Sequence, residues 1–174
     1  MQHILNDDGN TGKFHAVRSL HKGPALFAFI AVLWLGLVLG VSFLATPVKF
    51  QAPTLDLIAA LDVGRVTFAL FSKIEWPLCA TLIVAAAISP PLRRWSLTGA
   101  SILAMLLFIQ TIWLLPVLME RVSHIVAGAT VSSTHHHLFY VLFEAAKALL
   151  LITLAVGALA KITAPFGHEG QAYS

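Results

Sequence analysis

Long apolar stretches separated by short polar segments dominate this 174-residue chain. They cover residues 24–45, 66–88, 97–118 and 137–160. A hydrocarbon core of about 30 Å takes about 20 helical residues, so each stretch is long enough to cross it. The second stretch is the weakest, because Lys73, Glu75 and Pro77 interrupt it. The pattern predicts an all-α integral membrane protein, folded as a bundle of four transmembrane helices.

The composition agrees with a lipid environment. Hydrophobic residues make up 58% of the chain and charged residues 11%, whereas a soluble domain has about 45 to 50% and about 25%. The mean hydropathy is +0.85. The expected partner is therefore the lipid bilayer, together with a second copy of the chain or another subunit of a membrane complex. The basic residues behind the net charge of +3 are dispersed near the span ends, which argues against a nucleic-acid-binding surface.

The connection between the first two spans contains the sequence PTLDLIAALDVGR, residues 53–65. Its apolar residues recur with helical spacing, and Pro53 and Thr54 stand at its start, as at a helix N-terminus. This pattern predicts a short amphipathic helix at the membrane interface. The other connections, SPPLRRW and MERVSHIVAGATVSSTHHH, predict a tight turn and a longer loop.

The basic residues predict the orientation of the chain. Those near the termini and in the second connection are Lys13, Arg18, Lys22, Arg93, Arg94 and Lys161. With four crossings they all fall on one side, and basic residues remain in the cytoplasm. We expect cytoplasmic termini in a bacterial inner membrane, with mobile tails over 1–23 and 162–174 and a single transmembrane domain over 24–161. The first span exceeds the roughly 7 to 15 apolar residues of a signal peptide, and SFLATP lacks an A-x-A cleavage site, so this span is expected to be retained.

The fourth span carries a polar face. His137, Tyr140, Glu144 and Lys147 fall within an arc of about 80° on a helix. The rest of that span is apolar. Because ionisable groups are costly in lipid, we expect this face to point into the bundle.

Two other spans show similar polar faces. They consist of Arg65, Ser72, Glu75 and Cys79 in the second span and, provided that the helix continues through Pro116, of Gln110, Trp113, Glu120 and His124 in the third. At about 1.5 Å of rise per residue, Glu75, Gln110 and Glu144 lie about 10 to 15 Å below the non-cytoplasmic boundary, and Lys147 lies slightly deeper. The sequence therefore predicts a polar chamber in the outer half of the bundle, formed by Glu75, Gln110, Tyr140, Glu144 and Lys147.

A carboxylate in such a chamber must pair with a cation, bind one or take up a proton. One interpretation is an ion pair that orients the helices, with Gln110 as an interhelical hydrogen-bonding group. The other is a site that handles protons, cations or a small amphipathic solute. In that case Glu75 and Glu144 are the acceptors, and Lys147 is their counter-charge. His124 and His137 would gate or relay at the mouth of the chamber, and neither interpretation makes the protein an enzyme.

A third interpretation is a metal- or haem-dependent oxidoreductase, or a metal-handling protein, that uses the histidine-rich outer face. Glu120 and His124 are four residues apart, a spacing that can share a metal ion. Further ligands would come from His135, His136 and His137, although adjacent histidines are also typical of a solvated helix start. The chain contains no HExxH, CxxC or CxxCH motif, and Cys79 is its single cysteine. Zinc-peptidase, thiol-redox and c-type haem functions therefore lack their motifs.

Gly36 and Gly40 form a GxxxG motif in the first span. Such a motif lets helices approach closely. It predicts packing within the bundle or, alternatively, a contact in a homodimer or in a scaffold subunit of a membrane complex.

Several segments resemble a known group of proteins. They are WLGLVLGVSFLATPVKF, VGRVTFALFSKIEW, LPVLMERVSHIVAG and HHLFYVLFEAAKALLL, one from each span. Over about residues 25–160 the chain is similar to small bacterial four-span proteins of unknown function related to the transmembrane-protein-205-like group. This resemblance implies the fold class and the membrane location, and no catalytic residues. In size and span number the chain also resembles anthrone-oxygenase-like membrane proteins, which implies an oxidoreductase.

Overall fold

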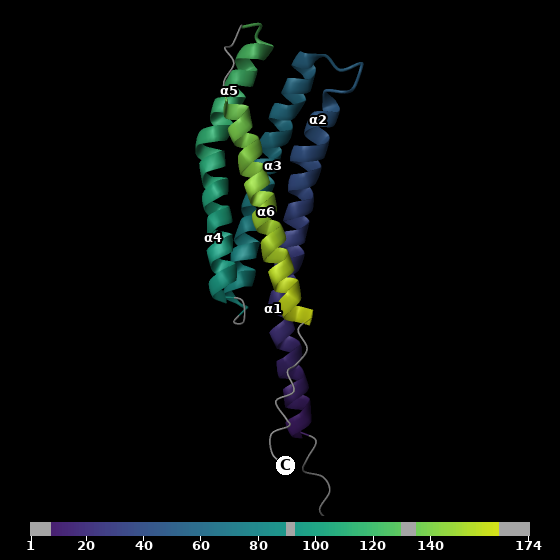
Figure 1. The fold of residues 1–174 in the computed structure, drawn as a ribbon, viewed down its shortest axis with the longest axis vertical. Helices are drawn as coiled ribbons and strands as arrows, with labels where there is room; N and C mark the ends of the chain where they lie inside the picture. The colour runs from purple at the N-terminus through teal and green to yellow at the C-terminus, as the bar shows by residue number, and fades with distance from the viewer. Residues whose placement is uncertain (1–7, 90–92, 130–134, 164–174) are drawn as a thin grey trace, which may run out of the picture.

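The computed structural model describes residues 8–89, 93–129 and 135–163, with side chains from residue 23 onward except that of Arg93. The helices are α1 (Asp8–Val38), η1 (Leu39–Ala45), α2 (Thr46–Lys49), α3 (Leu57–Ala87), α4 (Arg93–Ile109), η2 (Gln110–Leu114), α5 (Leu115–Val126) and α6 (His136–Thr163). The segments η1 and η2 are short π-helices. Because α1, η1 and α2 follow one another without a break, as do α4, η2 and α5, the chain forms four long rods (Figure 1).

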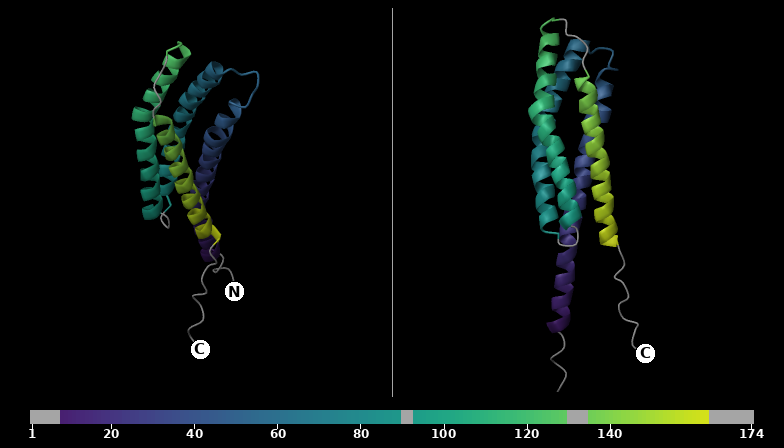
Figure 2. Two further views of the ribbon diagram at one scale, coloured as in Figure 1. Left: turned by 45° about the horizontal axis from the view of Figure 1, so that its top comes forward. Right: turned by 60° about the vertical axis from the view of Figure 1, so that its left-hand side comes forward.

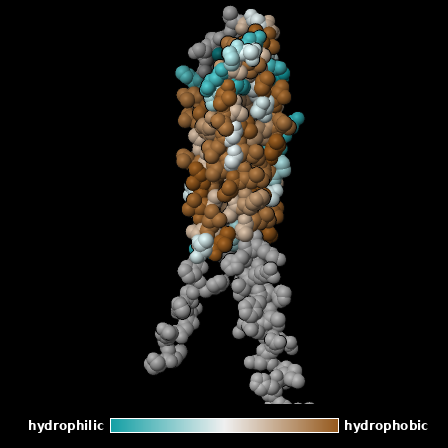
Figure 3. All heavy atoms as spheres, turned by 90° about the vertical axis from the view of Figure 1, so that its right-hand side faces the viewer, coloured by the Kyte–Doolittle hydropathy of each residue, from teal (hydrophilic) through white to brown (hydrophobic). Residues whose placement is uncertain are grey.

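Each rod is long and apolar enough to cross a membrane. The spans are Gly23–Lys49, Leu57–Ala87, Arg94–Val126 and His136–Thr163. Large apolar side chains cover the outside of the bundle, such as Phe29 and Leu149, which are 63% and 67% exposed. Figure 3 shows the resulting hydrophobic band, with hydrophilic residues near its upper end. The predicted four-helix membrane bundle is therefore confirmed.

The rods run in alternating directions. The end of α3, the start of α4 and the end of α6 lie at one end of the bundle, which we call the terminal end because α1 also enters there (Figures 1 and 2). The α2–α3 connection and the start of α6 lie at the opposite end, which we call the far end. Helix α1 packs along α6 and α3, and α3 packs along α4 and α5. Toward the far end, η1 and α2 diverge from α6 (Figure 2).

The half of the bundle at the terminal end has an apolar core. Phe27, Leu82, Leu103, Leu151 and Leu154 are almost completely buried in it. Close approach of α4 and α6 depends on two glycines, because a Cβ atom on Gly99 would overlap Leu154 and one on Gly157 would overlap Trp95. The terminal end is therefore a close-packed apolar plug.

Both π-helices end shortly before a proline. Pro47 and Pro116 have no backbone N–H, so the carbonyls four residues earlier lack their usual α-helical donor. These carbonyls belong to Phe43 in η1 and Ile112 in η2. A π-turn closes over five residues rather than four. Each π-turn thus shifts the faces of the following helix by about one residue, or about 100°.

The connection after the first span differs from its prediction. The separate interfacial helix expected over residues 53–65 is not formed, because residues from Leu57 onward are the first turns of α3. Asp56 caps this helix by accepting a 2.6 Å hydrogen bond from the Ala59 amide. No break follows Arg65, so the amphipathic segment joins the membrane span. At the termini, α1 begins at Asp8, while residues 1–7 and 164–174 of the expected tails lie outside the described residues.

Candidate functional site

One lysine lies between two glutamates inside the bundle. The Lys147 ammonium donates to Glu75 Oε1 at 2.5 Å and lies 2.9 Å from Glu144 Oε1. The three side chains are 0%, 1% and 1% exposed in that order. Glu144 and Lys147 are three residues apart and share one face of α6, whereas Glu75 comes from α3.

Three further side chains donate hydrogen bonds to these carboxylates. Gln110 Nε2 donates to Glu144 Oε1 at 2.6 Å. The Trp34 indole donates to Glu75 Oε1, and the Ser42 hydroxyl donates to Glu144 Oε2, each at 3.0 Å. We call these six residues, Trp34, Ser42, Glu75, Gln110, Glu144 and Lys147, the ion cluster. All four membrane-spanning rods contribute to it.

The two π-helices supply two of these donors. Ser42 lies within η1, and Gln110 is the first residue of η2. Next to Gln110, the hydroxyls of Thr111 and Ser72 lie 3.2 Å apart and link η2 to α3. π-Turns inside α-helices occur frequently at functional sites. The interrupted parts of two spans therefore meet at the ion cluster.

The charges of the ion cluster do not balance when all three groups are ionised. Lys147 offsets one carboxylate and leaves one buried negative charge, and a buried charge without a partner is very costly. In addition, the side-chain oxygen of Gln110 is buried and accepts no hydrogen bond. Because buried polar atoms are nearly always satisfied, the cluster has both an excess negative charge and a free acceptor.

A cavity of about 300 Å³ adjoins Glu144 on the side of the far end. It lies between η1, α2 and α6, and its lining is Ser42, Phe43, Thr46, Pro47, Phe50, Phe68, His137, Tyr140, Val141 and Glu144. The Tyr140 side chain is buried, packs edge-on against Phe68 with 4.8 Å between ring centroids, and interacts with Glu144 and Gln110. Toward the terminal end the neighbouring core is apolar. The cavity thus leads to Glu144 from the far end.

The predicted chamber residues lie together. Glu75, Gln110, Glu144 and Lys147 form direct contacts, and Tyr140 lies beside them. Sequence reasoning missed two members of the cluster. Neither Trp34 nor Ser42 was selected, because a single indole or hydroxyl in an apolar span has no periodic partner on its own helix.

The third span does not present one polar face along its whole length. Gln110 is buried, but Trp113 is 52% exposed, and the Glu120 and His124 side chains are 77% and 61% exposed. The expected single face over residues 110–124 is therefore wrong. It assumed a regular α-helix, whereas the π-helix η2 and Pro116 interrupt the register.

The predicted metal ligands are dispersed. Glu120 and His124 lie 3.9 Å apart. His136 packs edge-on against Trp113, His137 lines the cavity, and His135 is exposed. Within residues 8–89, 93–129 and 135–163, no group of three or more His, Cys, Asp and Glu side chains is close enough to hold a metal ion.

Gly36 and Gly40 do not pack against another helix in the part of the chain that the structure describes. A Cβ atom built on either residue would meet nothing within 4 Å. Packing within the bundle through this GxxxG motif is therefore wrong. The motif lies on the outside of the first span, where a second chain can reach it.

No family model, curated protein or solved structure matches this chain. The resemblance to the transmembrane-protein-205-like group stays a prediction. The interpretation of the site consequently depends on its own geometry.

Proposed function

We propose that this integral membrane protein binds and exchanges a proton at the ion cluster. The observation that carries the proposal is the sharing of one buried ammonium by two buried carboxylates, Glu75 and Glu144. One additional positive charge makes the cluster neutral. A proton is the smallest such charge, and it converts a carboxylate into a donor.

A proton suits the cluster better than a metal cation. The Lys147 ammonium already occupies the space between the two carboxylates, within 2.9 Å of both. A second cation bridging the same oxygens would be repelled by it. A proton bound to one carboxylate avoids this repulsion, because it forms a neutral acid whose O–H can be donated to a nearby acceptor such as Gln110 Oε1.

The cavity provides the route for exchange. Glu144 lies in its wall and also belongs to the ion cluster, so a proton arriving through the cavity reaches Glu144 first. With the terminal end in the cytoplasm, as the basic residues favour, this route opens on the non-cytoplasmic side. The apolar plug separates the cluster from the terminal end. A small amphipathic solute in the same cavity would then contact the group that exchanges the proton.

The alternative is an ion cluster with a purely structural role. The two hypotheses differ in whether a carboxylate of the cluster takes up a proton as the pH is lowered. Infrared spectroscopy of the purified protein in lipid detects the carbonyl band of a protonated carboxylic acid. We expect a component of this band, additional to those of the exposed carboxylic acids, to appear reversibly as the pH is lowered, and to be absent in Glu144→Gln, whose cluster is neutral with a single carboxylate. Glu120→Gln, which removes an exposed carboxylate of α5, is the control and should retain this component.

The proposal fails if the wild type and Glu144→Gln give the same carboxylic acid titration. It also fails if this additional component does not appear in the wild type. Glu75→Gln provides a second test, because it also leaves one carboxylate for one ammonium.

A further inference from the structure

Lys49 places a second, separate positive charge near the far end. It is the last residue of α2 and is half-buried. Its ammonium lies 5.0 Å from the centroid of the Phe50 ring and 5.7 Å from that of Phe68. In the described part of the chain, no carboxylate forms an ion pair with it. Lys49 is thus a cation held by aromatic rings and not balanced by an anion.

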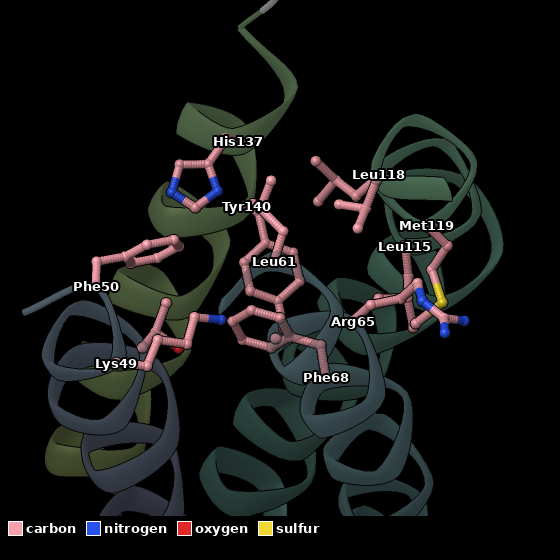
Figure 4. A pocket seen from close by; sticks show the side chains of 13 residues that line it. Lys49, Phe50, Leu61, Arg65, Phe68, Leu115, Leu118, Met119, His137 and Tyr140 are labelled. Carbon is pink, nitrogen blue, oxygen red and sulfur yellow. The ribbon is translucent and has the colours of Figure 1, made fainter. Parts of the chain in front are cut away.

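The slot beside Lys49 is narrow and mostly apolar. It has a volume of about 90 Å³, and α5 lines the side opposite Lys49 with Leu115, Leu118, Met119 and Val122. Figure 4 shows the Lys49 side chain directed toward the Phe68 ring, with Tyr140 and His137 above it. This geometry combines one cationic group with hydrocarbon walls.

Arg65 lines the same slot, but its charge is already compensated. Its Nε and Nη2 atoms donate to Asp62 Oδ1 at 2.9 and 2.7 Å. The net charge that the slot offers to a ligand therefore comes from Lys49. A ligand with one negative charge matches it better than a dianion does.

Gly64 makes room for the Lys49 ammonium. A Cβ atom at this position of α3 would overlap Lys49 Nζ. Helix α3 is continuous and α-helical here, so a side chain at this position would displace the lysine tip without disturbing a turn. The position of the cation in the slot thus depends on a glycine in the neighbouring helix.

We infer that this slot binds a small single-chain carboxylic acid, with its carboxylate on the Lys49 ammonium and its chain between α5 and α6. The slot adjoins the 300 Å³ cavity, because Thr46, Phe50, Phe68, His137 and Tyr140 line both. The slot alone, at about 90 Å³, is smaller than the usual small-molecule site of about 300 to 1,000 Å³, but together with the 300 Å³ cavity it reaches the lower part of that range, which suits one short chain. The inference goes beyond the proton site, since Lys49 is not a member of the ion cluster.

Octanoate binding to the full chain in phosphatidylcholine nanodiscs tests the inference. Calorimetry, corrected with empty nanodiscs, should show binding of octanoate and much weaker binding of octanol, which has the chain without the charge. Acetate, which has the charge without the chain, should not compete. Lys49→Gln should lower the affinity for octanoate about tenfold, the effect of losing one charged hydrogen bond. Lys49→Arg keeps the charge and should retain most of the affinity.

Lys73→Gln is the matched control, because Lys73 is an exposed cation of α3 outside the slot. It should bind octanoate like the wild type. Gly64→Ala gives an independent variant, in which the ammonium stays but is displaced, and it should also bind octanoate more weakly.

Equal affinities for octanoate and octanol, or wild-type affinity in both Lys49→Gln and Gly64→Ala, would overturn the inference. Absence of octanoate binding to the wild type, or effective competition by acetate, would do the same. The infrared titration of the ion cluster is a separate measurement, so failure of either proposal is recognised independently of the other.

Discussion

The two halves of the bundle are held together by different interactions. Near the terminal end, apolar side chains such as Leu103 and Leu151 are completely buried, and Gly99 and Gly157 allow α4 and α6 to approach. Toward the far end, buried charges and two π-helices replace this apolar core, and two cavities reach in among them. The hollow of about 310 Å³ near the terminal end, between α1 and α6, is by contrast open and lined by apolar side chains alone. The comparison indicates that a close-packed half adjoins a half whose helices are interrupted and whose charged groups are buried.

The largest loss of stability should come from a substitution of Lys147, at the centre of the ion cluster. Lys147→Met leaves Glu75 and Glu144 without their shared cation, and breaking a buried ion pair in this way costs about 3 to 5 kcal/mol. We expect a corresponding loss in the free energy of unfolding, measured in detergent by Trp fluorescence. Adding Glu75→Gln should recover part of the loss, because it removes one uncompensated carboxylate. The exposed Lys73→Met is the control, and an equal effect of the two substitutions would contradict the charge argument.

The apolar half should respond through cavity formation. Leu103 is 0% exposed, and Leu103→Ala is expected to cost about 3 kcal/mol, from lost contacts and the remaining void. Met105→Ala on the same helix is the control, because Met105 is 62% exposed and its truncation creates no internal cavity. The carboxylic acid titration of the ion cluster should persist in folded Leu103→Ala. If that titration disappears, the two halves are coupled more tightly than their separate packing suggests.

The smallest loss of stability should come from a glycine substitution, and it should differ between a glycine packed against another helix and a glycine on the outside of the bundle. Gly157→Ala brings a methyl group against the Trp95 ring and should cost about 1 to 2 kcal/mol by overpacking. Gly36→Ala meets nothing within 4 Å and should leave the bundle at least as stable as the wild type. Both changes alter helix propensity equally, so their difference in free energy of unfolding isolates the contact with Trp95. A destabilised Gly36→Ala would instead indicate that a second chain covers this face.

Much of the fold could be predicted because a helix that crosses the bilayer needs about 20 mostly apolar residues. Four stretches of sufficient length were apparent from hydrophobicity, and their depth followed from the rise per residue. The same counting placed Glu75, Gln110, Glu144 and Lys147 at a common level. In the structure these four side chains are in contact, and each helix is regular up to the residue concerned.

The remainder depended on features that no single span reveals. Glu120 and His124 were expected on the same face as Gln110. However, the π-helix η2, which begins at Gln110, and Pro116 interrupt the helical register before Glu120 is reached. Residues 53–65 were expected as a separate helix, but from Leu57 onward they continue into the next span without a break. Periodicity shows which face of a helix is polar, and it does not show where an α-turn becomes a π-turn.

The sequence by itself determined that this chain crosses a membrane four times and buries ionisable groups in one half, because lipid excludes both exposed backbone and unpaired charge. Only the tertiary structure decided which groups satisfy one another. Trp34 and Ser42 join the ion cluster from the first span, and Lys49 meets Phe68 from the second. Such contacts depend on how helices rotate and diverge relative to one another, and this geometry is fixed by packing among all four spans rather than by the pattern within any one of them.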